Sequence, residues 1–157
     1  MKDITACLWF DGQAEEAANL YVSIFPNSKI GDISRYGDTG PGPKGSVMMV
    51  TFELDGRKFS GLNGGPMFKF TEAVSFSVAC ETQAEVDHYW DSLIADGGQP
   101  SQCGWLKDRF GLSWQIVPTI LGKLAADPDR AKAGRVMQAM LKMVKLDIAE
   151  LEAAARG

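Results

Sequence analysis

The 157-residue chain contains the same local pattern twice, 70 positions apart. The tripeptide Gln-Ala-Glu begins at Gln13 and again at Gln83, and each copy follows an apolar run. At this offset Leu8 aligns with Val78, so the apolar runs correspond as well. Because each copy has the pattern of a strand followed by a helix, the chain is predicted to fold as two similar modules.

The first half is predicted to contain four strands and one helix. The strands cover residues 4–10, 29–36, 47–54 and 57–62, and the helix covers residues 13–25. Apolar residues at helical spacing define the helix. The last two strands flank Asp55-Gly56, a dipeptide typical of two-residue hairpins because both turn positions need a positive φ. Such a turn places Thr51 opposite Ser60 and Phe52 opposite Phe59.

The second half repeats this order and then changes character. A strand is expected at 73–80, a helix from the capping box of Thr82 and Glu85 to about Ala95, and strands at 103–107 and 112–117. After Pro118 we expect a short helix at 120–126 and one long helix at 130–155. The chain therefore divides into a first module (1–65), a linker (66–72), a second module (73–118) and a C-terminal helical extension (119–157).

Composition excludes several classes of partner. The net charge is −4 and no basic run is longer than a pair, which argues against nucleic-acid and anionic-membrane binding. No apolar stretch approaches the roughly 20 residues that span a bilayer. The N-terminus lacks the apolar region of a signal peptide, so a cytoplasmic location is expected. Cys7, Cys80 and Cys103 are then predicted to be free thiols.

Strand alternation separates an apolar face, which should pack on the helices, from a more polar one. The second face is expected to carry hydroxyl groups from both halves, namely Thr5, Thr51, Ser60, Ser75 and Ser77. Two interpretations stay open. The face is either exposed to solvent or forms a concave, partly polar pocket.

Three aromatic residues, Trp9, Tyr36 and Trp105, either form walls around an apolar ligand or fill the core. Tyr36 precedes a loop at 37–45 that is rich in Gly and Pro. This loop is interpreted as a mobile cover over a pocket mouth, because no helix and no Gly-Lys-Ser/Thr ending follows for phosphate binding. Asp108 is expected to bond backbone N–H groups of its turn, and His88 is expected on the surface.

The run at residues 103–118, CGWLKDRFGLSWQIVP, resembles the hallmark of the PhnB-like family, also labelled 3-demethylubiquinone 3-methyltransferase-like. This family is part of the vicinal oxygen chelate superfamily of glyoxalase, bleomycin resistance and dioxygenase proteins. The resemblance extends over nearly all of the chain. It implies an α+β fold in which two tandem βαβββ modules form a curved, mostly antiparallel eight-stranded sheet, with the site in its trough. The C-terminal helix is added to this fold.

The resemblance also implies where a metal would bind. Metal-dependent superfamily members take ligands from the first and last strands of each module. The matching positions here are Thr5, Ser75 and Gln115, with a fourth near Ser60 or Leu62. Neutral hydroxyls and one amide bind divalent iron, nickel or zinc poorly, so no metal and no cofactor is expected. The methyltransferase label finds no Gly-rich strand-to-helix turn for a nucleotide-like methyl donor.

The sequence therefore favours a metal-free binder of a small, partly apolar molecule. Its expected ligand-binding residues are Thr5, Trp9, Tyr36, Thr51, Ser60, Ser75, Ser77, Trp105 and Gln115. One alternative is a glyoxalase- or dioxygenase-type enzyme acting on a small oxygenated metabolite, and another is an interaction module without a ligand. A homodimer is expected, since related folds often complete their troughs across a two-fold axis.

Overall fold

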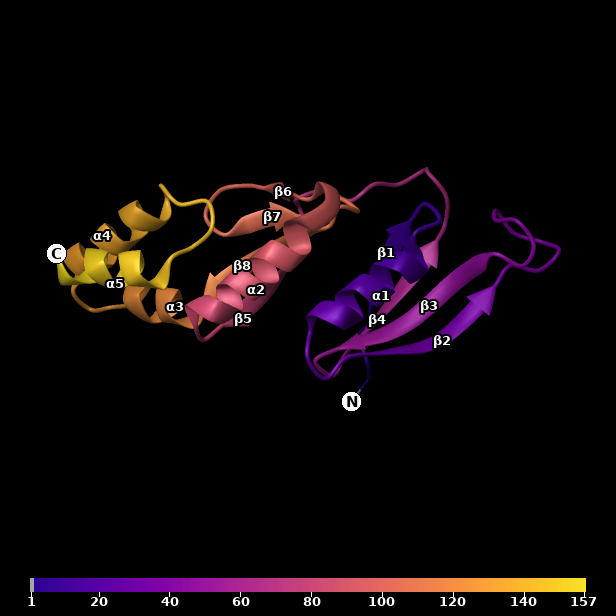
Figure 1. Ribbon diagram of the computed structural model, residues 1–157, viewed down its shortest axis with the longest axis horizontal. Coiled ribbons are helices and arrows are strands. Elements are labelled where there is room, and N and C mark those ends of the chain that lie inside the picture. Colours follow the sequence, from indigo (N-terminus) through magenta and orange to yellow (C-terminus); the bar gives the residue numbers. More distant parts are fainter. Residues whose placement is uncertain (1) are drawn as a thin grey trace. The chain divides into compact units, whose positions relative to one another are not determined.

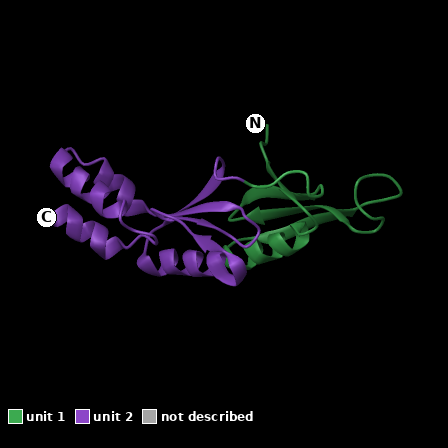
Figure 2. Cartoon of the chain, turned by 90° about the horizontal axis from the view of Figure 1, so that it is seen from above, with its two compact units in different colours: residues 1–70 green, residues 71–157 purple. Residues whose placement is uncertain are grey.

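Both predicted modules are present, each built from one four-stranded sheet and a helix on one of its faces (Figure 1). The structure is a computed structural model that describes residues 2–157. The chain separates into two units, Met1–Phe70 and Thr71–Gly157, coloured separately in Figure 2. Within residues 2–157, no helix combines the length and the apolar character needed to cross a membrane.

The first unit has the predicted βαβββ order. Its elements are β1 (Ala6–Phe10), α1 (Ala14–Ile24), β2 (Lys29–Arg35), β3 (Val47–Leu54) and β4 (Arg57–Asn63). The strands lie in the order β1-β4-β3-β2, with β1 parallel to β4 and the other neighbours antiparallel. The predicted hairpin register is confirmed, since Thr51 pairs with Ser60 and Phe52 with Phe59.

The second unit repeats this topology. Its elements are β5 (Ser75–Cys80), α2 (Gln83–Ile94), the short 3-10 turn η1 (Ala95–Gly97), β6 (Gln99–Pro100), β7 (Trp105–Lys107) and β8 (Ser113–Pro118). The order is β5-β8-β7-β6, with β5 parallel to β8 and the other neighbours antiparallel. The two-residue strand β6 was not predicted, because a pair of residues carries no alternation.

The predicted division of the strands into two faces is confirmed for β1, β3 and β4, whereas β2 is exposed at nearly every position. In the first unit Leu8, Val50 and Phe52 are buried, and α1 packs mainly on β3 and β4. Phe52 stacks on Phe59 with ring centroids 5.4 Å apart. Burying each such side chain contributes about 1.5–3 kcal/mol, so the helix-facing side of the sheet holds the unit together.

The single long helix predicted for residues 130–155 is wrong. The extension contains three helices, α3 (Thr119–Ala125), α4 (Arg130–Met140) and α5 (Ile148–Arg156). Between α4 and α5, the carbonyls of Met143 and Val144 accept bonds from the backbone N–H groups of Cys103 (2.9 Å) and Gly104 (2.8 Å). Asp147 then caps α5 by accepting from the N–H of Glu150 at 2.9 Å.

Apolar residues such as Val136, Met140 and Leu151 recur at roughly helical spacing and suggested a continuous helix, because both helices bury side chains in one cluster. The buried members of this cluster are Val136, Met143, Leu146, Leu151 and Ala155. Periodicity alone does not record the break, since the segment between the helices also contributes to the cluster.

Gln83 fixes this extension to α2. Its Nε2 donates to the carbonyl of Leu146 at 3.2 Å, and its Oε1 accepts from the N–H of Ile148 at 2.8 Å. Lys145 adds an ion pair with Asp87 at 3.1 Å. Gln13, the matching residue of the first repeat, makes no such side-chain bond at the start of α1. The second copy of the repeated Gln therefore has an additional structural role.

Asn63 connects the end of β4 to the start of α1. The side chain is 8% exposed, and its Oδ1 accepts from the N–H of Ala14 at 2.9 Å. Its Nδ2 donates to the carbonyl of Val47 at 3.0 Å. One side chain thus satisfies a free N–H of the helix start and positions two strands, because α1 has no side-chain cap of its own.

We expect Asn63→Ala to lower the free energy of unfolding by about 2 kcal/mol, since it leaves the N–H of Ala14 and the carbonyl of Val47 without partners. Urea unfolding followed by circular dichroism measures the change. Asn19→Ala is the matched control, because the Asn19 side chain bonds only at an exposed position of α1. Equal losses in the two variants would contradict this role.

We expect Gln83→Leu to release the extension without unfolding the module, because two hydrogen bonds to residues 146–148 are lost. Hydrogen exchange at the amide of Ile148 should accelerate at least tenfold, which corresponds to about 1.4 kcal/mol of local stability. Gln138→Leu, at an exposed position of α4, should leave this rate unchanged. Unchanged exchange in Gln83→Leu would show that other contacts hold the extension.

Candidate functional site

The face of the second sheet that points away from α2 carries two rows of mostly polar side chains. One row runs across β5, β8 and β7 as Ser77, Gln115 and Trp105, and the neighbouring row as Ser75, Ser113 and Lys107. Ile116 and Trp114 alternate with these residues and are buried toward the helix side. Side chains in register lie about 5 Å apart at Cβ, so each row is a contiguous strip.

Within this grid, Gln115 and Ser75 bind each other. The Nε2 of Gln115 donates to the Oγ of Ser75 at 2.9 Å, across the diagonal between the two rows. Both residues were predicted to line the site, and the structure brings them together with Ser77 and Trp105. Their contact orients the amide and leaves its carbonyl oxygen as an acceptor on the same face.

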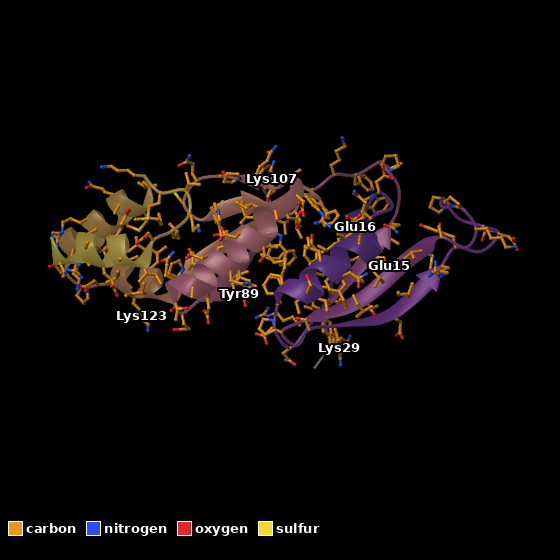
Figure 3. The ribbon with its side chains drawn as sticks, in the orientation of Figure 1. Glu15, Glu16, Lys29, Tyr89, Lys107 and Lys123 are labelled. Atoms are coloured by element: carbon orange, nitrogen blue, oxygen red, sulfur yellow. The ribbon has the colours of Figure 1, made fainter. Side chains whose placement is uncertain are left out.

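A hollow of about 180 Å³ opens beside the Ser113–Lys107 row. It is lined by Glu72, Gln99, Pro100, Ser101, Trp105, Leu106, Lys107 and Ser113. The ammonium of Lys107, labelled in Figure 3, forms an ion pair with the carboxylate of Glu72 at the rim. The hydrogen bond from Lys107 lowers the pKa of Glu72 below its usual value, so this carboxylate stays ionised at neutral pH.

Ser113 is the unusual member of this hollow. The residue is 1% exposed, and its Oγ has no hydrogen-bond partner within residues 2–157. A buried hydroxyl without a partner costs about 1–3 kcal/mol. Sequence analysis missed Ser113, Lys107 and Glu72. Alternation places Ser113 on the face of Gln115, but the connection at residues 108–112 did not fix its register with β7.

The first sheet presents a comparable but less polar face. Cys7 pairs with Ser60, and Ser60 pairs with Thr51. Cys7 lies 70 positions before Ser77, which pairs with Gln115 in the second unit. Ser60 therefore occupies the closing position that corresponds to Gln115, and Leu62 does not. The sequence alone had left these two positions open.

Thr51 supports a backbone irregularity in β2. Its Oγ1 accepts from the N–H of Asp32 at 2.8 Å, where the pairing of β2 with β3 shifts register. A Cβ at Gly31 would overlap this hydroxyl, so glycine is required there. Ligand binding by Thr51 stays a prediction. Thr5 precedes β1 and is exposed, and its role stays a prediction as well.

Tyr36 packs inside the loop at residues 37–45. The side chain is 7% exposed, its hydroxyl donates to the carbonyl of Asn63, and Gly42 lies directly against the ring. Any side chain at Gly42 would overlap that ring. Core filling is therefore the role that the contacts of Tyr36 display, and a ligand contact stays a prediction.

Trp9 is partly covered by the segment that follows β4. Its Nε1 donates to the carbonyl of Gly65 at 2.8 Å, and its ring meets Phe68 edge-on with centroids 4.8 Å apart. Trp105 is also half-buried, and it borders the hollow of the second unit. Trp105 belongs to the grid of the second sheet, where it pairs with Gln115.

The donor set does not fit a divalent metal ion. Within residues 2–157, no three His, Cys, Asp or Glu side chains lie close enough together to hold one. The positions matching superfamily ligands carry the neutral groups of Ser75 and Gln115, which are poor ligands for iron, nickel or zinc. His88 lies exposed on α2, with its ring 4.9 Å from that of Tyr89.

The turns that lead into the helices also do not fit a nucleotide-like methyl donor. The first N–H of α1 is taken by Asn63, and the start of α2 is capped by Thr82, which accepts from the N–H of Glu85 at 3.2 Å. At each helix start a side chain of the protein thus occupies one of the N–H donors that would face an anionic ligand. Neither turn is Gly-rich, in contrast to the usual dinucleotide-type sites.

Asp108 has the structural role predicted for it. Its Oδ1 accepts from the N–H groups of Phe110 (2.9 Å) and Leu112 (3.1 Å), and its Oδ2 from the Nε1 of Trp114 (2.9 Å). Arg109 lies 3.6 Å from Asp96 and over the ring of Phe110. The buried carboxylate therefore fixes the turn that leads into β8, which carries Ser113 and Gln115.

The described chain matches one protein family. A family model described as 3-demethylubiquinone-9 3-methyltransferase matches residues 2–117. A PhnB protein from Bacillus cereus is 39% identical, with a TM-score of 0.68 over 75% of this chain and 100% of that chain. A protein from Pseudomonas aeruginosa is 18% identical, with a TM-score of 0.62 over 75% of this chain and 98% of its own. No curated protein matches.

The chain therefore belongs to the 3-demethylubiquinone-9 3-methyltransferase family, which is the PhnB-like family predicted from residues 103–118. The two βαβββ modules agree with the glyoxalase/bleomycin resistance/dioxygenase fold predicted with it. The match to the family model ends at residue 117, so the extension that contains α3, α4 and α5 lies beyond it.

We expect iodoacetamide to label Cys7 well before Cys80 in the folded protein. Cys7 is exposed, whereas Cys80 is buried. Burial, and to a smaller extent the negative charge of Glu85, raises the pKa of Cys80 to about 11. At pH 8 only about one Cys80 thiol in a thousand is then ionised. Peptide mass spectrometry measures the order. Denaturant should equalise the two rates, and equal rates in the folded protein would contradict the burial.

Proposed function

We propose that the protein binds a small, partly aromatic and oxygen-bearing molecule on the non-helix face of the second sheet, without a metal ion. Gln115, Ser75 and Ser77 supply neutral hydrogen-bonding groups, and Trp105 supplies an aromatic surface beside them. The mechanism is recognition or sequestration of this ligand.

One observation carries this proposal. The closing position of the second module holds Gln115, whose side chain is kept in place by Ser75 at 2.9 Å and is flanked by Trp105 in register. A fixed amide next to an aromatic ring suits a ligand whose ring carries oxygen substituents. The amide offers these oxygens directional hydrogen bonds without a charge. The family description names demethylubiquinone, an oxygen-substituted ring compound, and so supports this ligand class.

The enzyme alternative requires a proton acceptor on the face. Glu72 borders it, but the neighbouring Lys107 lowers the pKa of this carboxylate and thereby weakens it as a base. Simple binding is therefore the better supported function. The homodimer and the cytoplasmic location expected from the sequence remain part of the proposal.

The proposal is tested with methyl 4-hydroxybenzoate, a neutral ring compound with oxygens at both ends. We expect saturable binding in the presence of a chelator, seen as NMR shifts in β5, β7 and β8. Gln115→Leu should weaken binding about five- to tenfold, the range of one neutral hydrogen bond.

Gln138→Leu is the matched control, because it makes the same substitution at an exposed position of α4 and should bind like the wild type. Absence of saturable binding, or binding that needs added zinc, nickel, iron or manganese, would overturn the proposal.

A further inference from the structure

The hollow beside Ser113 and Lys107 contains a charged hydrogen-bond donor, which binding of an uncharged ligand does not require. Its two donors, the Ser113 hydroxyl and the Lys107 ammonium, stand directly opposite each other in the register of β7 and β8. Both residues line the same space, and so does Glu72, whose carboxylate is paired with the Lys107 ammonium. Two donors and one positive charge at a single concave spot are complementary to an anionic group.

The Ser113 hydroxyl is a buried donor without a hydrogen-bond acceptor among residues 2–157. It is 1% exposed and lacks a hydrogen bond within residues 2–157, although buried hydroxyls are nearly always bonded. Ser75 lies next to it in register, but no hydrogen bond joins the two hydroxyls. A bound acceptor in the hollow would satisfy the hydroxyl of Ser113.

Glu72 shows what kind of group fits beside Lys107. Its carboxylate is paired with the ammonium, yet its side chain is 62% exposed and belongs to the turn before β5. Exposed ion pairs contribute little stability, so another carboxylate can replace this one at low cost. The protein's own side chain thus stands where a ligand carboxylate would bind.

The size of the hollow limits the ligand. About 180 Å³ is below the roughly 300 Å³ of a typical ligand pocket, so the hollow holds one functional group and not a whole molecule. The row of Gln115 and Trp105 lies two residues further along the strands, about 7 Å away. This spacing is comparable to the length of a benzene ring with substituents at opposite ends.

We propose that the Ser113–Lys107 hollow is a carboxylate subsite, which binds the acidic end of an aromatic ligand while Gln115 and Trp105 hold its other end. The inference rests on the proposed function, whose ligand it specifies as an aromatic acid. Ser113 donates its O–H to one carboxylate oxygen, and Lys107 pairs with the group after Glu72 moves away.

The test compares 4-hydroxybenzoate with methyl 4-hydroxybenzoate by isothermal titration at low salt. The acid should bind the wild-type protein about tenfold more tightly than the ester, and added salt should weaken the binding of the acid only. Lys107→Met should abolish this preference and leave the affinity for the ester unchanged. Lys123→Met is the matched control, because Lys123 is an exposed lysine on α3, also labelled in Figure 3.

Two further variants separate a binding role from a structural one. Ser113→Ala should weaken binding of the acid about threefold, while the Tm of the free protein stays the same or rises, because an unpartnered buried hydroxyl is removed. Glu72→Gln should tighten binding of the acid severalfold, since it removes the competing carboxylate. A lower Tm in Ser113→Ala, or weaker binding of the acid in Glu72→Gln, would overturn the assignment.

The outcomes also distinguish this inference from the proposed function. If acid and ester bind equally and Lys107→Met changes neither affinity, the carboxylate subsite is wrong while the binding face stands. If Lys107→Met and Lys123→Met weaken binding of the acid equally, the loss reflects the change in net charge and not a specific contact. The subsite is then wrong as well. If neither compound binds, both proposals fall.

Discussion

The parallel pairing of the first and last strands of each module determines what the rest of the molecule can do. Because β4 returns beside β1, and β8 beside β5, the closing strand lies inside its sheet and not at an edge. The crossover helix covers one face of each sheet and buries its apolar side chains. The opposite face is thereby left to side chains whose composition is not required for packing. In the second unit this face carries mostly polar side chains in the two rows that contain Gln115 and Ser113.

The chemistry of that face separates this protein from the metal-dependent branch of its superfamily. At the matching positions Ser75 and Gln115 bind each other, which satisfies the serine acceptor and fixes the amide. Ionisable groups lie one row away, where Lys107 meets Glu72. The face therefore combines neutral, directional groups beside an aromatic ring with one charged end. This combination is the basis of our proposal that the face recognises a ligand.

Several buried or half-buried polar side chains serve the scaffold and not the site. Asn63 joins β4 to α1, Asp108 fixes the turn into β8, and Gln83 fastens the extension to α2. Each bonds backbone groups that secondary structure leaves unpaired, which is the usual role of buried polar residues. By holding β8 and its preceding turn in place, Asp108 indirectly positions Ser113 and Gln115. Thr51 and Tyr36 likewise use their hydroxyls within the first unit.

The sequence alone determined the two modules, the faces of the strands, the hairpin register at Asp55-Gly56 and the family. These follow from local patterns, since alternation, turn residues and caps act within a few positions. Only the tertiary structure decided the break between α4 and α5, the equivalence of Ser60 with Gln115, and the row that joins Ser113 to Lys107. Each of these depends on register or backbone pairing between segments distant in the chain. A pattern of apolar and polar residues does not encode such pairings, because the same alternation is compatible with several registers.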